Sequence, residues 1–118
     1  MTVEISSFAD AGVHEKERLI IKAIADVDIG KYGVFRSGTS DDGKPLSGSK
    51  IAYWFPDQQV KAGDLIVLYT KTGKSSKKEL SSGHTAYFYY WHREKPLWGT
   101  GKHTAVLFRI AEWTHQIS

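Results

Sequence analysis

Hydrophobic residues occur along the chain in short runs, separated by clusters of glycine, proline, aspartate and serine. The run Leu65–Tyr69 follows a turn signal at Lys61–Asp64 and precedes Gly73. Five apolar residues are too few for a helix, and β-branched and aromatic side chains favour a strand. Alternate strand residues point to opposite faces, and both faces of this run are apolar. The pattern predicts a central strand covered on both sides.

Similar runs predict further strands over 3–5, 32–36, 51–55, 85–92 and 104–113. The stretches between them are rich in turn-forming residues and are expected to be loops. Six or seven short strands separated by turns are typical of a β-sandwich or a small barrel. The sequence therefore predicts a single all-β domain over 1–118, a sandwich, with a small β-barrel as the alternative. Residues 1–14 are expected to form either an edge strand or a loosely attached arm.

The segment 15–27 fits two structures. Its apolar residues would share one face of a helix with a charged first turn. Its β-branched residues also fit a strand that ends at the turn Asp28–Lys31. We favour the strand and keep an N-terminal helix as the alternative.

Composition supports an ordinary globular domain rich in β-structure. Of 118 residues, 41% are hydrophobic and 25% charged, which separates the chain from disordered proteins. Four Trp, six Tyr and five Phe residues suit pleated surfaces. No signal-peptide pattern and no apolar run long enough to span a membrane is present. We therefore expect a cytoplasmic domain without membrane contact.

Catalytic and metal-binding templates fail. The chain has no Cys, so disulfides, thiolate zinc sites and thiol nucleophiles are excluded. A phosphate-binding loop ending at Gly73 would need glycine where Leu68 stands. The segment Asp26–Gly30 resembles a calcium loop, but Ser37 occupies the place of the bidentate Glu. No cofactor, metal ligand or catalytic residue is predicted, although an acid–base pair assembled by the fold stays open.

The histidines offer one enzymatic alternative. His84, His92 and His103 flank loops between neighbouring predicted strands, so the fold would be able to bring them together. A small enzyme with a histidine and carboxylate site is therefore the second alternative function. We favour the simpler interpretation that these are exposed loop residues.

Two stretches combine basic and aromatic residues. Lysines neutralise phosphates and aromatic rings stack on unpaired bases, so such stretches are candidates for nucleic-acid binding. The net charge of only +3 permits an anionic partner without demanding one. We expect Trp91 and Trp98 to be core anchors rather than stacking platforms. The candidate binding residues are Lys71, Lys74, Lys77, Lys78, Trp91, His92, Arg93, Lys95, Trp98 and Lys102.

Several short motifs occur in a familiar order. They are Tyr53-Trp-Phe-Pro56, Val60-Lys-Ala-Gly-Asp-Leu-Ile-Val67, an aromatic strand, Trp98-Gly99 and Ala105-Val-Leu-Phe108. This order resembles the lamin-tail type of immunoglobulin-like β-sandwich over about residues 18–113. The family's Gly-Trp strand is missing, and the chain has no Asn for the family's Asn-containing turns. The resemblance implies an immunoglobulin-like sandwich with a non-enzymatic binding or scaffolding role and no transferable site residues.

The leading functional hypothesis is a non-catalytic binding module that recognises a protein or another extended surface through loops and exposed aromatic residues. A protein is the favoured partner. Nucleic-acid binding through the basic and aromatic stretches is the alternative.

Overall fold

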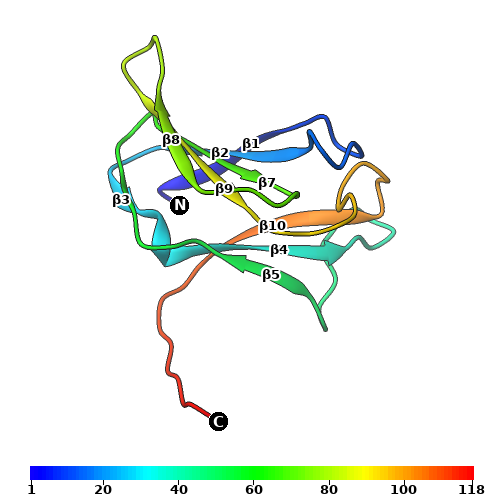
Figure 1. Cartoon of the computed structure of the whole chain (residues 1–118). Helices are drawn as coiled ribbons and strands as arrows, with labels where there is room; N and C mark the ends of the chain where they lie inside the picture. The colour runs from blue at the N-terminus through cyan, green and yellow to red at the C-terminus, as the bar shows by residue number, and fades with distance from the viewer.

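Ten strands and one short 3-10 turn, Ile29–Lys31, make up the regular structure of the chain. The computed structural model describes all 118 residues and contains no α-helix (Figure 1). It therefore has no helix capable of crossing a membrane. The strands are β1 (Val3–Ala9), β2 (Arg18–Ala23), β3 (Val27–Asp28), β4 (Tyr32–Gly38), β5 (Ile51–Trp54), β6 (Gln59–Val60), β7 (Leu65–Tyr69), β8 (Ser76–Glu79), β9 (Thr85–Tyr90) and β10 (His103–Arg109).

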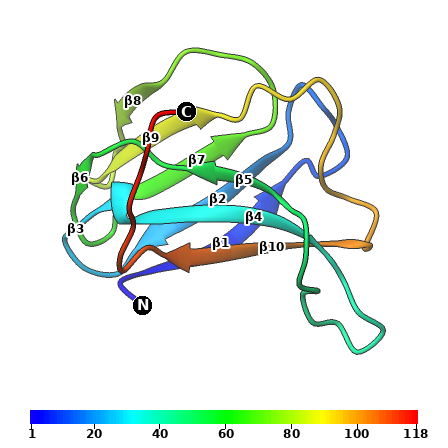
Figure 2. The same ribbon diagram turned by 90° about the horizontal axis from the view of Figure 1, so that it is seen from below.

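The strands form two facing layers, as Figure 1 shows. One layer is a five-stranded sheet in the order β1-β2-β7-β9-β8, and the other is a three-stranded sheet in the order β10-β4-β5. A small ladder of β3 and β6 lies at one side (Figure 2). All neighbours are antiparallel except β7 and β9, which run parallel. The prediction of an all-β sandwich is confirmed.

The core lies between the two sheets because alternate residues of each strand point inward. In the larger sheet these are Leu19 and Ile21 of β2, and Ile66 and Leu68 of β7. The smaller sheet contributes Tyr32 and Val34 of β4, both almost fully buried. Side chains of β5 and β10 on the same face, such as Tyr53 and Leu107, pack against this cluster.

The central position predicted for Leu65–Tyr69 is confirmed, but its cover on both sides is not. β7 is the middle strand of the five, and the smaller sheet covers only its inner face. Val67 on the outer face is still buried, because it lies in the ladder between Ile20 and Phe88. The sequence predicted that a second layer would cover this face of the strand. Large neighbours within the same sheet bury Val67 instead.

The boundaries of several elements differ from the predictions. The favoured strand within 15–27 is confirmed as β2, and β1 is a paired edge strand that continues to Ala9. The stretch between the predicted strands 65–69 and 85–92 was expected to be a loop, but it contains β8, whose four residues are all exposed. An edge strand with charged side chains has no hydrophobic alternation, so the pattern did not reveal it. The last strand ends at Arg109, and residues 110–118 leave the sandwich as a tail (Figures 1 and 2).

Candidate functional site: a cationic cavity

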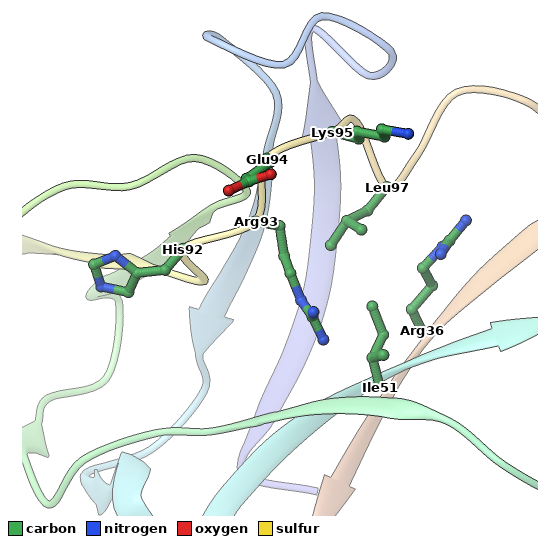
Figure 3. A pocket seen from close by; sticks show the side chains of 7 residues that line it. All are labelled: Arg36, Ile51, His92, Arg93, Glu94, Lys95 and Leu97. Carbon is green, nitrogen blue, oxygen red and sulfur yellow. The ribbon is translucent and has the colours of Figure 1, made fainter.

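A cavity of about 470 Å³ opens at one end of the sandwich. One wall comes from Arg36 of β4 and Ile51 of β5, which belong to the smaller sheet. The other wall comes from the loop that follows β9. Figure 3 shows Arg93 descending from this loop and Arg36 rising from β4, with Ile51 and Leu97 between them. The lining residues are Arg36, Ile51, His92, Arg93, Glu94, Lys95 and Leu97.

Strand alternation places Arg36 on the inner face of its sheet. Tyr32 and Val34 precede it on this face and are buried in the core. In the ladder Arg36 lies between Ala105 and Ile51, which both pack against the core. Arginine at an inward position is uncommon, because its charge must leave water. Arg36 therefore brings a cation to the open end of an otherwise apolar layer.

The guanidinium group of Arg36 contacts histidine and no carboxylate. Its Nη2 lies 3.1 Å from Nδ1 and 3.0 Å from Nε2 of His103. Burial, the charge of Arg36 and the charge of Lys102 lower the pKa of His103 below its usual value of 6.5. His103 is therefore neutral at neutral pH, and the Nη2 of Arg36 lies against an uncharged ring, about equally close to both ring nitrogens. The Nε of Arg36 is closed off from solvent and has no hydrogen-bond partner.

The loop after β9 is fixed in place by backbone bonds to the end of β7. The backbone N–H of Trp91 donates to Tyr69 at 2.8 Å, and that of Arg93 donates to Thr70 at 2.8 Å. Between them, His92 adopts a left-handed conformation with φ 58°, which turns the chain sharply out of the strand. This turn leaves His92 exposed and directs Arg93 toward the cavity.

A buried carboxylate holds the second half of the same loop. Glu17 is fully buried and accepts from the backbone N–H of Leu97 at 2.7 Å and of Gly12 at 2.9 Å. The hydroxyl of Thr70 also donates to it. A buried carboxylate is stable only with such donors around it. Glu17 therefore ties three segments together behind the cavity wall.

Positive charge in and around the cavity is not compensated by ion pairs. Arg36, Arg93 and Lys95 form no ion pair with any carboxylate, and Glu94 forms none with them. In Figure 3 the carboxylate of Glu94 points away from the guanidinium of Arg93. Three cationic residues from two different elements thus line one opening, and none of them forms an ion pair with the one acidic residue among them.

The structure divides the candidate binding residues into three groups. His92, Arg93 and Lys95 line the cavity, and exposed Lys102 lies next to His103. Lys71 and Lys74 belong to the loop after β7, while Lys77 and Lys78 lie on edge strand β8. Trp91 and Trp98 are buried in the core cluster and present no free ring to a ligand. They are core anchors, as expected for these two residues.

The exposed tryptophans lie elsewhere on the molecule. Trp54 on β5 is 52% exposed and Trp113 in the tail is 59% exposed. Their rings meet edge to face with centroids 5.3 Å apart. Neither residue lines the cavity, so the aromatic part of the predicted recognition surface does not coincide with its basic part.

The three histidines do not converge. His84 and His92 flank opposite ends of β9, which places them roughly 26 Å apart along an extended strand. His84 instead lies 3.9 Å from Asp64, whose carboxylate already accepts from the backbone of Lys61 and Thr85. No group of three His, Asp or Glu side chains is placed to hold a metal ion. The convergence of His84 with His92 and His103 that the enzymatic alternative required is therefore absent.

Sequence reasoning missed Arg36 and its contact with His103. The available signal was spacing, since Arg36 continues the inward series of Tyr32 and Val34 at intervals of two. A charged residue in such a series indicates a site at the end of a layer. The contact with His103 depends on the pairing of β4 with β10, which no local pattern specifies.

The arrangement suits the binding of an anion by charge and hydrogen bonds. It contains donors, an apolar floor and access from solvent. No protein-family model matches this sequence, and comparison with curated proteins finds no match.

Proposed function

We propose that this chain is a non-catalytic binding module whose partner is a protein with an acidic segment. The observation that carries the proposal is that Arg36, Arg93 and Lys95 line one cavity and that none of them has a carboxylate partner. An acidic partner supplies the missing counter-charge. Loops at the end of a rigid sandwich are common recognition surfaces, because the sheets fix their positions.

Binding to a fluorescein-labelled peptide of glutamate and glycine, followed by fluorescence anisotropy, tests this proposal. The double variant Arg93→Glu/Lys95→Glu is expected to bind at least about tenfold more weakly, a loss of about 1.4 kcal/mol. The double variant Lys31→Glu/Lys61→Glu carries the same change of net charge away from the cavity and serves as control. Equal weakening in both variants, or no binding by the natural chain, would contradict the proposal.

Nucleic-acid binding is a second candidate, favoured by one contact. The backbone N–H of His92 donates to the carbonyl of Lys71 at 3.3 Å, so the lysine loop adjoins the cavity loop. Lys71 and Lys74 could thereby extend the cationic surface along a phosphate backbone. A labelled single-stranded oligonucleotide should then lose affinity steeply between about 50 and 200 mM salt. The absence of such binding would remove this candidate.

We also propose, as a finer classification, that the sandwich is of the lamin-tail immunoglobulin-like type with a scaffolding role. What supports it is the placement of two motif elements. Phe55 and Pro56 follow directly after β5, and Gly63-Asp64 lies directly before β7. Superposition of an experimental structure of this chain on a lamin-tail domain tests the proposal, and a different strand order would contradict it.

A further inference from the structure

The arginines of this protein are held in different ways. Arg18 donates to the carboxylate of Asp10 at 2.9 Å, so its charge is compensated within the chain. Arg36 is partly buried at an inward position, and its side-chain partner is the imidazole of His103. A neutral imidazole orients a guanidinium without cancelling its charge. The structure therefore fixes the direction of Arg36 and leaves its full positive charge available.

A cation removed from water without a counter-charge is destabilising. A satisfied structural arginine would be expected to meet a carboxylate, and Arg36 meets none. Its Nη1 has no protein acceptor and is the nitrogen left for a ligand, whereas the unpartnered Nε is closed off from solvent. These observations indicate that the counter-charge comes from outside the chain.

We propose that the cavity is a binding site for an oxyanion, a carboxylate or phosphate group, with Arg36 as its principal ligand and His103 as the residue that positions Arg36. This inference rests on the proposed function and deepens it by naming the chemical group that is recognised. The planar guanidinium donates two parallel N–H bonds to such a group, a geometry that lysine cannot reproduce. Arg93 and Lys95 add positive charge around the same opening.

The apolar residues of the cavity also have a role in this site. Ile51 and Leu97 lie between the two guanidinium groups, and Leu97 is buried. They provide an apolar surface for the carbon atoms next to the oxyanion and reduce the local dielectric, which strengthens the charge interactions. Glu17 fixes the backbone of Leu97, so this wall is built before a ligand arrives.

Small anions provide the test, independent of any partner. We would titrate the natural chain with sodium acetate and with sodium phosphate at constant ionic strength and follow two kinds of NMR signal. The side-chain N–H of Arg36 reports on the natural chain, and the backbone N–H signals of the cavity loop, Arg93 to Lys95, report on every variant, Arg36→Met included. A saturable shift of these signals is expected. Arg36→Met should weaken anion affinity at least about tenfold, because a bidentate donor is lost. Arg109→Met removes the same charge at the far end of β10 and should leave the affinity unchanged.

The two titrations distinguish the sources of the group. A response to acetate comparable with that to phosphate supports a carboxylate of a partner protein, and a response to phosphate alone supports a phosphorylated ligand. Equal weakening in Arg36→Met and Arg109→Met, or a shift that does not saturate, would overturn the inference. Undiminished binding of the glutamate peptide by Arg36→Met would overturn it too, while the proposed function would stand.

A substitution at His103 tests the positioning role. His103→Phe keeps an aromatic ring of similar size and removes the two ring nitrogens that Nη2 contacts. The N–H signal of Arg36 should broaden even without anion, and anion affinity should fall several-fold. A residue that only fills space would leave that signal unchanged, so an unchanged signal would overturn the role of His103.

Discussion

The carboxylate of Glu17 and the backbone N–H of Leu97, eighty positions apart in the chain, meet at 2.7 Å inside the protein. Glu17 precedes the second strand of the larger sheet, whereas Leu97 belongs to the cavity loop. Their hydrogen bond joins the start of the sandwich to the wall of the candidate site. The stability of the fold and the shape of the candidate site therefore depend on one buried group.

Glu17→Gln should destabilise the protein markedly. The amide keeps one acceptor oxygen but directs an NH₂ group toward a site where three donors converge, so at least one backbone N–H, that of Gly12 or of Leu97, loses its partner. We expect the free energy of unfolding to fall by about 2–3 kcal/mol. Urea denaturation measures this loss, and hydrogen exchange should quicken at the amide of Leu97.

Glu15→Gln is the control for this prediction. Glu15 is exposed and contacts only His14, so its substitution should change stability by less than about 0.5 kcal/mol. A loss of similar size in both variants would show that Glu17 has no special role.

The pH dependence of stability should reveal His103. Burial, with the charges of Arg36 and Lys102, lowers its pKa in the folded protein, so the unfolded chain binds the proton more tightly. The contribution of His103 to the free energy of unfolding is fully present above about pH 6.5. It is lost as the pH falls through that value toward the pKa of His103 in the folded protein. Unfolding free energies measured between about pH 5 and 8 should therefore rise with pH.

His103→Gln isolates this contribution, because glutamine keeps a polar acceptor but does not titrate. Its curve should be flatter than that of the natural chain over the same range. Saturating acetate should also flatten the natural curve, since a bound anion next to Arg36 opposes the charge that depresses the pKa of His103. Parallel curves for the natural chain and the variant would contradict the assignment.

The fold was more predictable than the site, for a physical reason. Burial imposes alternation on each strand separately, so Leu19–Ile21, Leu65–Tyr69 and Thr85–Tyr90 could be recognised from local sequence. β8 could not, because an exposed edge strand is under no such constraint. The parallel pairing of β7 with β9 also left no local signature.

The cavity depends on contacts that join distant segments. His92, Arg93 and Lys95 were identified because charge and aromatic residues gather there in the sequence. Arg36 stands among apolar neighbours, and only the pairing of β4 with β10 brings it to His103. Composition can indicate a charged loop. The strand register decides which core-facing cation, here Arg36, lines the same cavity as that loop.

Alkaline pH should destabilise the protein through Tyr89. Its ring is buried against Phe55, and burial first, then the charges of Tyr53, Tyr87 and Asp28, raise the pKa of Tyr89 to about 12. The unfolded chain therefore releases this proton at lower pH than the folded chain. Stability falls as the pH rises from about 10 toward 12, by a total of about 2–3 kcal/mol.

Tyr89→Phe should reduce this alkaline loss while keeping the ring and its packing. Denaturation measured at several alkaline pH values gives the slope for both proteins. In the folded natural chain, absorbance near 295 nm should show tyrosines that ionise late, because the pKa values of Tyr53 and Tyr87 are raised as well, and the variant should show one fewer. An unchanged alkaline slope in Tyr89→Phe would contradict the origin of the shift.

Arg36→Met should separate binding from stability. If Arg36 is retained for a ligand, its unpaired charge destabilises the free protein, and an apolar side chain of similar length removes that penalty. The substituted methionine would continue the apolar inward series of β4 beside Ala105 and Ile51. We expect the free energy of unfolding without anion to rise by about 1 kcal/mol, while anion binding is lost.

Urea denaturation measures this change, and Arg109→Met should stay within about 0.5 kcal/mol of the natural chain. If Arg36→Met were less stable than the natural chain, Arg36 would be a residue that supports the fold. Its unpaired charge in the cavity would then be a consequence of packing and not a feature for binding.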